Sequence, residues 1–504
     1  MIISDIKLDI ERQDDVLSEA ARICGKMPPY FRILKKSLDA RNKSDIKYVF
    51  SVEVSDSPFL KSEPKRLPLG KIPQLPIVVV GSGPSGLFCA LKLVEYGFKP
   101  IVVERGDEID KRIAKINAFT KNRTLDTESN IQFGEGGAGT FSDGKLNTNT
   151  HSGYIGEVLD TFVTFGAPEE IKWLAKPHIG SDRIRLAVKN MREKLIKSGC
   201  NVMFNSKLTD LQICNGKVNA VIVNGQRIEV SDVVLAIGHS ARDTFRMLGD
   251  RGVKLSPKDF AVGVRVEHLQ EKISFSQYGN AFRKLPPADY KLVSHAADRA
   301  VFTFCMCPGG YVVPAASEAN GVVTNGMSNY ARDGQNANSA VIAQVYAKDF
   351  GNTVYGGMNF QRELERLAFK EGGGDYSAPS QTLGDFLACK KTTSFGCVKP
   401  SYPFVKPTDL NIIFPSHISQ ALRKAFMDMD KRLRGFADKE AVLTGPETRT
   451  SSPIRIDRNE LLCSVSADGL YPCGEGAGYA GGITSAAVDG LRVAEAIFKK
   501  YDNT

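Results

Sequence analysis

The pattern of hydrophobic and polar residues divides this chain of 504 residues into four parts. Residues 1–70 contain alternating and helical segments, which predict a small α+β domain that ends in a linker. In residues 75–250, short apolar strands alternate with amphipathic helices, as in a doubly wound parallel sheet. Residues 251–455 contain strand-like runs followed by helical stretches, which predict an inserted domain with a mixed or antiparallel sheet. Residues 456–504 are expected to return to the parallel sheet.

The first part has its own predicted elements. Residues 2–10 and 47–54 alternate like strands, and the apolar face of residues 15–24 predicts a helix. Residues 31–40 predict a second helix. Residues 60–75 are rich in proline and lysine and predict the linker to the next domain.

A glycine-rich turn at the end of the first buried strand is the most informative motif. The turn G-S-G-P-S-G follows the apolar residues 77–80 and opens a helix. Gly81 permits the tight turn, Gly83 lets the backbone approach a pyrophosphate, and Gly86 lets helix and strand pack closely. The predicted nucleotide contacts of this unit are Gly81, Ser82, Gly83, Pro84, Ser85, Gly86, Glu104 and Arg105.

An acidic residue narrows the choice of nucleotide. Residues 101–103 form a second apolar strand that ends on Glu104, whose carboxylate is expected to accept hydrogen bonds from ribose hydroxyls. An acid at this position favours a free 2′-hydroxyl, as in FAD or NAD, over the phosphate of NADP.

Two further motifs favour FAD. Residues 469–478 place a short strand before G-E-G-A-G and a final helix, an arrangement that resembles the second FAD motif of glutathione-reductase-type flavoproteins. Residues 233–239 resemble the strand that ends in A-T-G in the same superfamily, with Ile237 in place of Thr. Glu475 stands where that superfamily usually has Asp. FAD is therefore the predicted cofactor, and NADH or NADPH stays open as a transient reductant.

The resemblance also implies cofactor contacts outside the first motif. Members of the superfamily place a glycine-rich loop over the pyrophosphate and the flavin ring, and residues 130–147 take that place here. Lys145 would then approach the N1/O2 edge of the flavin; the alternative is a flexible loop with an incidental lysine. The contacts implied in this way are Gly136, Gly137, Gly139, Thr140, Lys145, Leu208, Gly238, Gly474, Glu475, Gly482, Ile483 and Thr484.

Candidate catalytic residues lie at three places in the sequence. Lys145 belongs to the glycine-rich loop, and His239 follows the A-T-G-like strand as either a proton donor or a structural histidine. Glu447 and Arg449 lie in a polar segment just before the chain returns to the parallel sheet, where they are candidates for substrate orientation or acid–base work. The six histidines show no metal-ligand spacing, so no metal site is predicted.

The pair Cys305 and Cys307 allows two interpretations. The spacing C-x-C on a regular strand places both thiols on one face, so buried strand cysteines are expected rather than a redox pair. The ten cysteines of the chain form no C-x-x-C pair and are expected to be reduced thiols of a cytoplasmic protein.

Composition and charge exclude some classes of protein. With 42% hydrophobic and 24% charged residues, global disorder is not expected. No apolar run approaches the roughly 18 residues that a membrane helix needs, and no secretory leader is recognised. The net charge is +9, and a group of basic residues lies in the first domain. These residues either form a face that binds RNA or an acidic partner, or they are the solvated face of a helix. Those basic residues are Arg32, Lys35, Lys36, Arg41, Lys43 and Lys47.

Taken whole, the chain resembles an uncharacterised bacterial family of FAD-dependent dehydrogenases, often labelled NAD(FAD)-utilising. The resemblance is carried by the loop F-G-E-G-G-A-G-T-F-S-D-G-K-L at 133–146 and the ending G-E-G-A-G-Y-A-G-G-I-T-S-A-A-x-D-G at 474–490. It implies an α/β fold in which an inserted mixed α+β substrate domain interrupts a Rossmann-like FAD-binding domain, with the small α+β domain in front.

The activity implied is hydride transfer through flavin N5 to or from a small-molecule substrate or electron carrier. Reductase or dehydrogenase action is favoured over monooxygenation. Because residues 251–455 contain no G-x-G-x-x-G, no separate NAD domain is expected. The alternatives are an RNA-associated flavoprotein that uses the first domain, and a scaffold with structural FAD. Substrate, electron donor and oligomeric state stay open.

Overall fold

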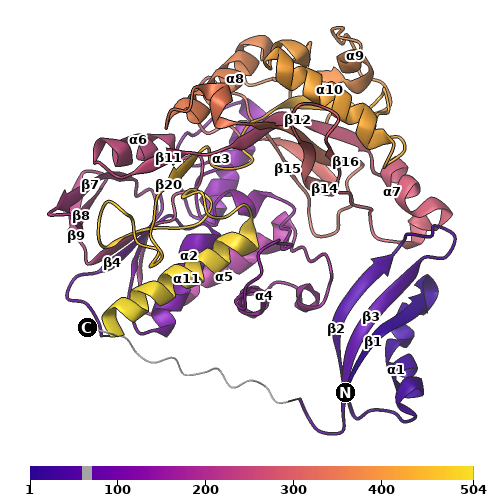
Figure 1. The fold of residues 1–504 in the computed structure, drawn as a ribbon, viewed down its shortest axis with the longest axis horizontal. Coiled ribbons are helices and arrows are strands. Elements are labelled where there is room, and N and C mark those ends of the chain that lie inside the picture. The colour runs from indigo at the N-terminus through magenta and orange to yellow at the C-terminus, as the bar shows by residue number, and fades with distance from the viewer. Residues whose placement is uncertain (60–70, 503–504) are drawn as a thin grey trace.

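The structure contains the parallel sheet predicted from the apolar strands, and Figure 1 labels one of its strands, β4. The structure is a computed structural model that describes residues 1–59 and 71–502. The five strands of this sheet pair in parallel, so their carboxyl ends meet at one edge. In spatial order they are β21 (Leu470–Pro472), β10 (Asp232–Leu235), β4 (Ile77–Val80), β5 (Ile101–Val103) and β6 (Asn201–Met203).

Both faces of the five-stranded sheet are covered, which explains why its strands are continuously apolar. Helices cover the first face, and a three-stranded antiparallel meander with a further helix covers the second. The first face carries α2 (Pro84–Glu95), α4 (Ile155–Thr164), α5 (Ser181–Lys197) and α11 (Ile483–Asp502). The second carries β7 (Leu208–Cys214), β8 (Lys217–Val223), β9 (Gln226–Glu229) and α6 (Arg242–Asp250). Helix α3 (Ile109–Asn122) lies between β5 and the glycine-rich loop in the chain.

A second, eight-stranded sheet confirms the predicted mixed α+β insertion. Its strands are mainly antiparallel, and α8 and α10 pack on one of its faces (Figure 1). The strands are β13 (Val293–Ser294), β14 (Val301–Pro314), β16 (Asn336–Val345), β12 (Phe260–Leu269), β19 (Val442–Glu447), β17 (Ala378–Thr382) and β18 (Val405–Pro407), with β15 (Thr324–Met327) beside β14. The helices are α7 (Gln270–Tyr278), α8 (Gly356–Gly372), α9 (Leu383–Leu387) and α10 (Ser416–Asp430). A small ladder of β11 (Leu255–Pro257) and β20 (Ile454–Ile456) joins the two domains.

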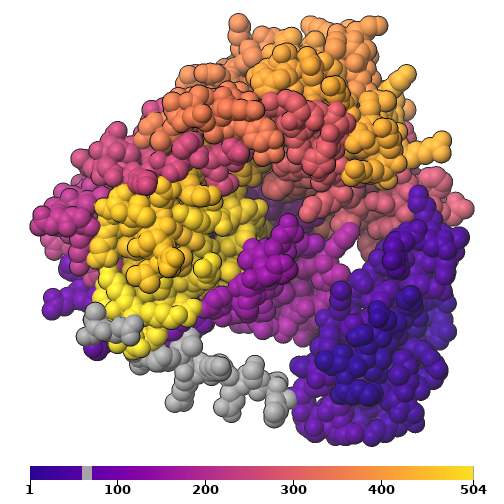
Figure 2. Space-filling view, in the orientation of Figure 1, coloured from indigo at the N-terminus to yellow at the C-terminus, as the bar shows by residue number. Residues whose placement is uncertain are grey.

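The first domain contains a three-stranded antiparallel sheet with one helix packed on it. The order is β1 (Ile2–Asp9), β3 (Lys47–Ser55) and β2 (Tyr30–Asp39), and the helix is α1 (Val16–Cys24). It forms a separate lobe beside the rest of the molecule (Figure 2). The linker predicted over residues 60–75 falls largely outside the described residues.

The helix predicted over residues 31–40 is wrong, because this segment is strand β2. It pairs with β3, and a register shift between Ile33 and Lys35 interrupts the alternation that would have identified a strand. The basic residues therefore share no helix face, and several of them have partners. Arg32 pairs with Glu53, Arg41 with Asp39, and Lys47 with Asp9 and Asp45, while Lys36 lies over the Tyr48 ring and Lys43 donates to the Ser276 carbonyl.

Among the described residues, none of the helices combines the length and the apolar character that crossing a bilayer requires.

A glycine sets the distance between α2 and α11. A Cβ atom built on Gly490 would lie 2.2 Å from the backbone oxygen of Ser85, so Gly490→Ala forces the two helices apart. We expect this substitution to destabilise the protein by about 1–3 kcal/mol, the usual cost of overpacking. Thermal unfolding followed by circular dichroism measures the effect.

The matched control is Gly156→Ala in α4, where a Cβ would meet nothing within 4 Å. Because alanine favours helices, this variant should keep or slightly raise the melting temperature. Equal melting temperatures for the two variants would contradict the proposed contact between α2 and α11.

Candidate functional site

A cavity of about 320 Å³ lies where the two large domains meet. One wall consists of the carboxyl ends of β4, β5 and β10 with the turns that follow them, and the other comes from the eight-stranded sheet and the returning chain. Ligands in open α/β folds bind at this edge of the sheet. The sheet domain contributes Phe304, Cys305, Asn325 and Glu447, which come from strands β14, β15 and β19.

Most of the residues predicted from sequence line this cavity. The lining ones are Gly81, Gly83, Pro84, Ser85, Glu104, Arg105, Gly137, Gly139, Leu208, Gly238, Glu475, Gly482 and Ile483, together with Lys145, His239, Glu447 and Arg449. The others stand behind the lining, namely Ser82, Gly86, Gly136, Thr140, Gly474 and Thr484.

Two glycines of the first turn serve the packing of the protein itself. A Cβ on Gly81 would lie 2.2 Å from the Ala236 oxygen, and one on Gly86 would lie 1.9 Å from the Gly81 oxygen. Gly81 also has a φ of +101°, which strongly favours glycine. These two positions hold strand, turn and helix in close contact.

Three other glycines leave space open in the cavity. A Cβ on Gly83 would meet nothing closer than 3.8 Å, and one on Gly481 or Gly482 nothing within 4 Å. All three line the cavity, and their φ angles do not require glycine. Their missing side chains therefore expose backbone to a ligand. This is what an extended dinucleotide with a pyrophosphate needs.

Two helices begin at the cavity. Gly83 and Pro84 start α2, and Gly482 and Ile483 start α11. The first N–H groups of a helix lack partners within it and carry partial positive charge. The cavity can therefore bind two separate anionic groups, such as a pyrophosphate and a negatively charged ring.

Glu104 has a structural role that the sequence did not reveal. Its buried carboxylate accepts hydrogen bonds from Ser82 N (2.9 Å), Ser82 Oγ (2.8 Å), Gly106 N (3.1 Å) and Gly134 N (3.0 Å). A carboxylate offers about four acceptor positions, and all are used here. Glu104 thus ties the glycine turn to the glycine-rich loop, while still lining the cavity.

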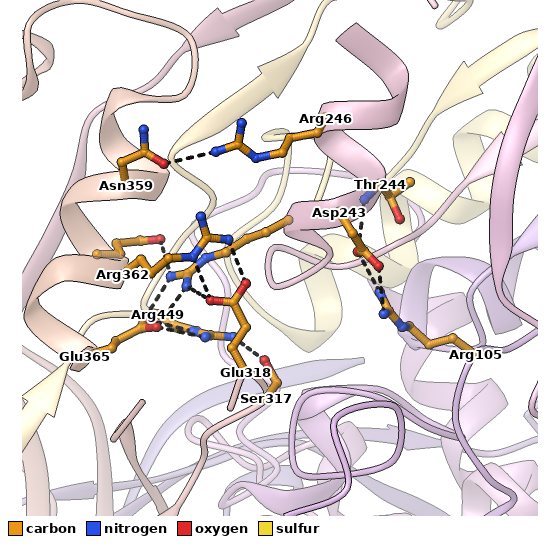
Figure 3. A network of polar contacts seen from close by, with 12 residues as sticks. Arg105, Asp243, Thr244, Arg246, Ser317, Glu318, Asn359, Arg362, Glu365 and Arg449 are labelled. Atoms are coloured by element: carbon orange, nitrogen blue, oxygen red, sulfur yellow. Dashed lines mark hydrogen bonds and ion pairs between the residues drawn. The ribbon is translucent and has the colours of Figure 1, made fainter. Parts of the chain in front are cut away.

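Arg105 lies at the cavity with its charge already paired. It forms ion pairs with Glu128 at 2.7 Å and with Asp243 at 2.9 Å, and Lys207 contacts the same two carboxylates. The contact with Asp243 joins the end of β5 to helix α6 (Figure 3). The side chain of Arg105 therefore connects elements of the protein beside the cavity.

Lys145 is fixed by a buried carboxylate. Its Nζ lies 2.7 Å from Asp143 and also contacts the Met306 backbone oxygen. Asp143 pairs in addition with Arg332 at 2.5 Å. Burial alone would raise the pKa of Asp143, but the charges of Lys145 and Arg332 lower it to about 2. The loop thus holds its lysine in one place at the cavity wall.

His239 and Glu475 are neighbours in the lining of the cavity. His239 Nε2 lies 3.7 Å from Glu475 Oε1, and its Nδ1 lies 3.0 Å from Ser240 Oγ. Burial, with the nearby charges of Arg449 and Arg242, lowers the pKa of His239 to about 3. Burial raises the pKa of Glu475 to about 7, against the effect of Lys258. Near neutral pH the histidine is uncharged, and Glu475 can gain or lose a proton.

Glu447 belongs to a polar cluster organised by Arg265, a residue that the sequence reasoning missed. The fully buried guanidinium binds Glu447 through two hydrogen bonds of 2.8 and 2.9 Å. It also donates to the Cys305 carbonyl oxygen at 2.9 Å and to Asn325 Oδ1 at 3.2 Å. Three cavity-lining residues therefore depend on one arginine.

Arg449 belongs to a second buried network that the sequence reasoning also missed (Figure 3). It binds Glu365 at 3.0 and 2.9 Å, and Arg242 binds the same carboxylate with two bonds of 2.8 Å. Glu318 bridges Arg242 and Arg362. A charged residue inside an otherwise apolar strand or helix face is the signal that could have identified Arg265 and Glu365 in the sequence.

The two cysteines of the C-x-C segment do not follow the geometry expected for a regular strand. The pairing of β14 with β16 shifts between Phe304 and Cys307, and Cys305 has a φ of +42°. This bulge interrupts the alternation of the strand. Cys305 lines the cavity, whereas Cys307 is buried.

Comparisons with known proteins agree with this geometry. Residues 259–450 match a family described as "FAD-dependent protein, C-terminal domain-like", and residues 79–137 match an NAD(P)-binding Rossmann-like domain. Residues 1–55 match a domain of unknown function (DUF8436). A protein of Clostridium beijerinckii, named "Uncharacterized protein", is 46% identical over an alignment that covers 99% of each chain. The chain belongs to the same family. It is an FAD-dependent flavoprotein.

The solved structures to which this chain is similar include two of low sequence identity. One is a geranylgeranyl bacteriochlorophyll reductase-like protein from Thermoplasma acidophilum, with 14% identity, 86% of this chain and 83% of that chain covered, and a TM-score of 0.38. Another is L-proline dehydrogenase from P. horikoshii, with 14% identity, coverages of 86% and 95%, and a TM-score of 0.37.

The open position at Gly83 yields a test of cofactor binding. Gly83→Val places a side chain at the point of the cavity where the pyrophosphate is predicted to approach. It should weaken FAD binding at least about tenfold, or about 1.4 kcal/mol. Gly153→Val is the control, because a Cβ at this exposed position away from the cavity meets nothing within 4 Å. The ratio of flavin to protein absorbance after gel filtration measures retention. Full retention of FAD by the Gly83 variant would rule out this placement of the cofactor.

The pair of Arg265 with Glu447 yields a test of stability. Glu447→Gln leaves the fully buried guanidinium without a counter-charge and should destabilise the protein by about 3 kcal/mol. In the exposed pair of Arg22 with Glu19, Glu19→Gln should leave the melting temperature unchanged. Both are measured by thermal unfolding, and a Glu447 variant as stable as the Glu19 variant would contradict the role given to the buried pair.

Proposed function

We propose that this flavoprotein is an oxidoreductase that passes a hydride between its flavin and a small molecule or electron carrier. One observation carries the proposal, namely that residues of the nucleotide-binding turns and residues of the eight-stranded sheet line the same cavity. A cofactor held by the first set of residues would expose its reactive face to a compound held by the second.

The residues that would hold the adenosine diphosphate part are those of the first turn and the strand that follows. Gly83 and the start of α2 offer unpaired N–H groups, and Leu208, the first residue of β7, also lines the cavity. Gly238, Glu475, Gly482 and Ile483 lie where the ribityl chain and the ring would be held. When bound, FAD supplies the two-electron chemistry of the reaction.

The side chains around the ring position would tune that chemistry. The start of α11 and the cation of Lys145 favour negative charge at the cavity wall. His239 is neutral near pH 7, because its pKa lies near 3, so it offers a hydrogen-bond partner rather than a charge. Glu475, with a pKa raised to about 7, can hold or release a proton as the substrate changes protonation.

NADH or NADPH would act as a transient reductant in this scheme. The nucleotide would have to enter the same cavity, because the inserted domain carries no second glycine fingerprint. A reduced substrate or a protein carrier would replace it if neither nucleotide reacts.

Anaerobic titration of the flavin absorbance with NADH and then NADPH tests the proposal. We expect NADH, NADPH or light to bleach the flavin band. An artificial electron acceptor should then restore it. Lys145→Met should slow the reduction about tenfold or more, because a fixed charge beside the ring is removed. Lys99→Met is the control, since Lys99 is exposed and away from the cavity. A flavin that neither dithionite nor light reduces would favour a structural role for FAD.

A further inference from the structure

Two cysteines with different surroundings lie at the substrate side of the cavity. Cys305 is half-buried and lines the cavity, while Cys307 is fully buried two residues later. Met306 alone separates the two cysteines on β14, so the chain itself keeps the two residues close together. The bulge at Cys305 changes the direction of the strand between the two thiols.

The two thiols are coupled to each other and to two cations. Cys307 Sγ lies 3.3 Å from the Cys305 carbonyl oxygen, and the two side chains share a hydrogen bond. That hydrogen bond lowers the pKa of Cys305 to about 6, against burial and with help from Arg265 and Lys145. The same hydrogen bond and burial raise the pKa of Cys307 well above its usual value. Near neutral pH the two cysteines therefore share one proton: Cys307 is a thiol and Cys305 is a thiolate.

The other buried cysteines have no comparable environment. Burial raises the pKa of Cys89, Cys200, Cys463 and Cys473, as expected for inert thiols in apolar surroundings. None of these four lines the cavity. Within the described residues, the lowered pKa and the position at the cavity are found together at Cys305.

We propose that Cys305 and Cys307 are a redox-active dithiol that exchanges two electrons with the flavin, so that the substrate of this site is a disulfide or a thiol. The proposal deepens the proposed function and rests on it. Cys305 faces the cavity and is the thiol that attacks the substrate, and the buried Cys307 is the resolving thiol.

The electrons and protons of the exchange balance. When Cys305 thiolate and Cys307 thiol form an S–S bond, the S–H bond of Cys307 breaks, and two electrons and that proton convert FAD to its reduced anion. In the opposite direction, the two electrons and the one proton of the reduced anion would regenerate the thiolate of Cys305 and the thiol of Cys307, with no proton taken from solvent. Attack of the Cys305 thiolate on a substrate disulfide forms a mixed disulfide and releases one substrate thiolate. Cys307 then closes the S–S bond and releases the second, so two substrate thiols carry away both electrons.

A chemical map of the cysteines tests the pair without any substrate. Cleavage after Arg299 and Arg332 releases the peptide 300–332, whose only cysteines are Cys305 and Cys307. Full-length holoprotein is oxidised in air, unfolded with iodoacetamide and analysed by mass spectrometry. We expect this peptide to carry no alkyl label and to gain two labels after anaerobic photoreduction of the flavin. Two labels in the air-oxidised protein would overturn the proposal.

Anaerobic dithionite titration supplies the second measurement. The oxidised wild-type holoprotein should take up two reducing equivalents more per chain than Cys305→Ser or Cys307→Ser. Cys214→Ser is the matched control, because Cys214 is exposed on β7 and does not line the cavity, and it should behave like the wild type. Equal uptake by the wild type and the serine variants would overturn the dithiol.

Failure of this proposal and failure of the proposed function are distinguishable. If NADH or NADPH reduces the flavin reversibly while both cysteines are labelled under all conditions, the proposed oxidoreductase function stands and the proposed dithiol is wrong. A flavin that cannot be reduced removes both. The mapping of the wild-type peptide keeps the proposal testable even where a serine variant fails to fold.

Discussion

The position of the two large domains relative to each other depends on one buried carboxylate. Glu365 on α8 belongs to the inserted domain, Arg242 begins α6 of the nucleotide-binding domain, and Arg449 lies on the returning chain. Glu365 accepts two hydrogen bonds from each arginine, at 2.8 to 3.0 Å, and is 1% exposed. Because an unpaired buried charge costs about 3–5 kcal/mol, the two arginines must stay where Glu365 holds them. The cavity lies at this junction, so its shape follows from the same contact.

The electrostatics of the cavity are set by pairing rather than by the net charge of +9. Arg105, Arg265 and Arg449 all touch or approach the cavity, and each has a carboxylate partner. The attraction for anions comes instead from the starts of α2 and α11, and from Lys145, which shares its one carboxylate partner, Asp143, with Arg332. Two arginines near His239 add to the effect of burial, and this keeps the imidazole neutral. The cavity can therefore attract anionic groups even though the arginines around it are neutralised by carboxylates.

The sequence predicts the parts of the site that depend on local backbone geometry. Gly83 and Gly482 follow from short motifs whose spacing is fixed by strand, turn and helix. Arg265 and Glu365 do not, because their partners lie 182, 123 and 84 residues away and only the folded chain brings them together. The mistaken helix at residues 31–40 and the unexpected orientation of Cys305 share one cause. In both strands a register shift interrupts the period of two on which sequence patterns depend.

The backbone at Cys305 illustrates how the second domain holds a strained residue at the cavity. A φ of +42° is unusual for a residue other than glycine, and such conformations cost about 1–3 kcal/mol. The charged hydrogen bond from Arg265 to the Cys305 carbonyl, 2.9 Å long, contributes about 1.5–3 kcal/mol and offsets that cost. Arg265 can do this because Glu447 neutralises its charge and fixes its plane with two bonds. The bulge, the buried ion pair and the thiol at the cavity therefore form one unit, in which a change to any member would alter the other two.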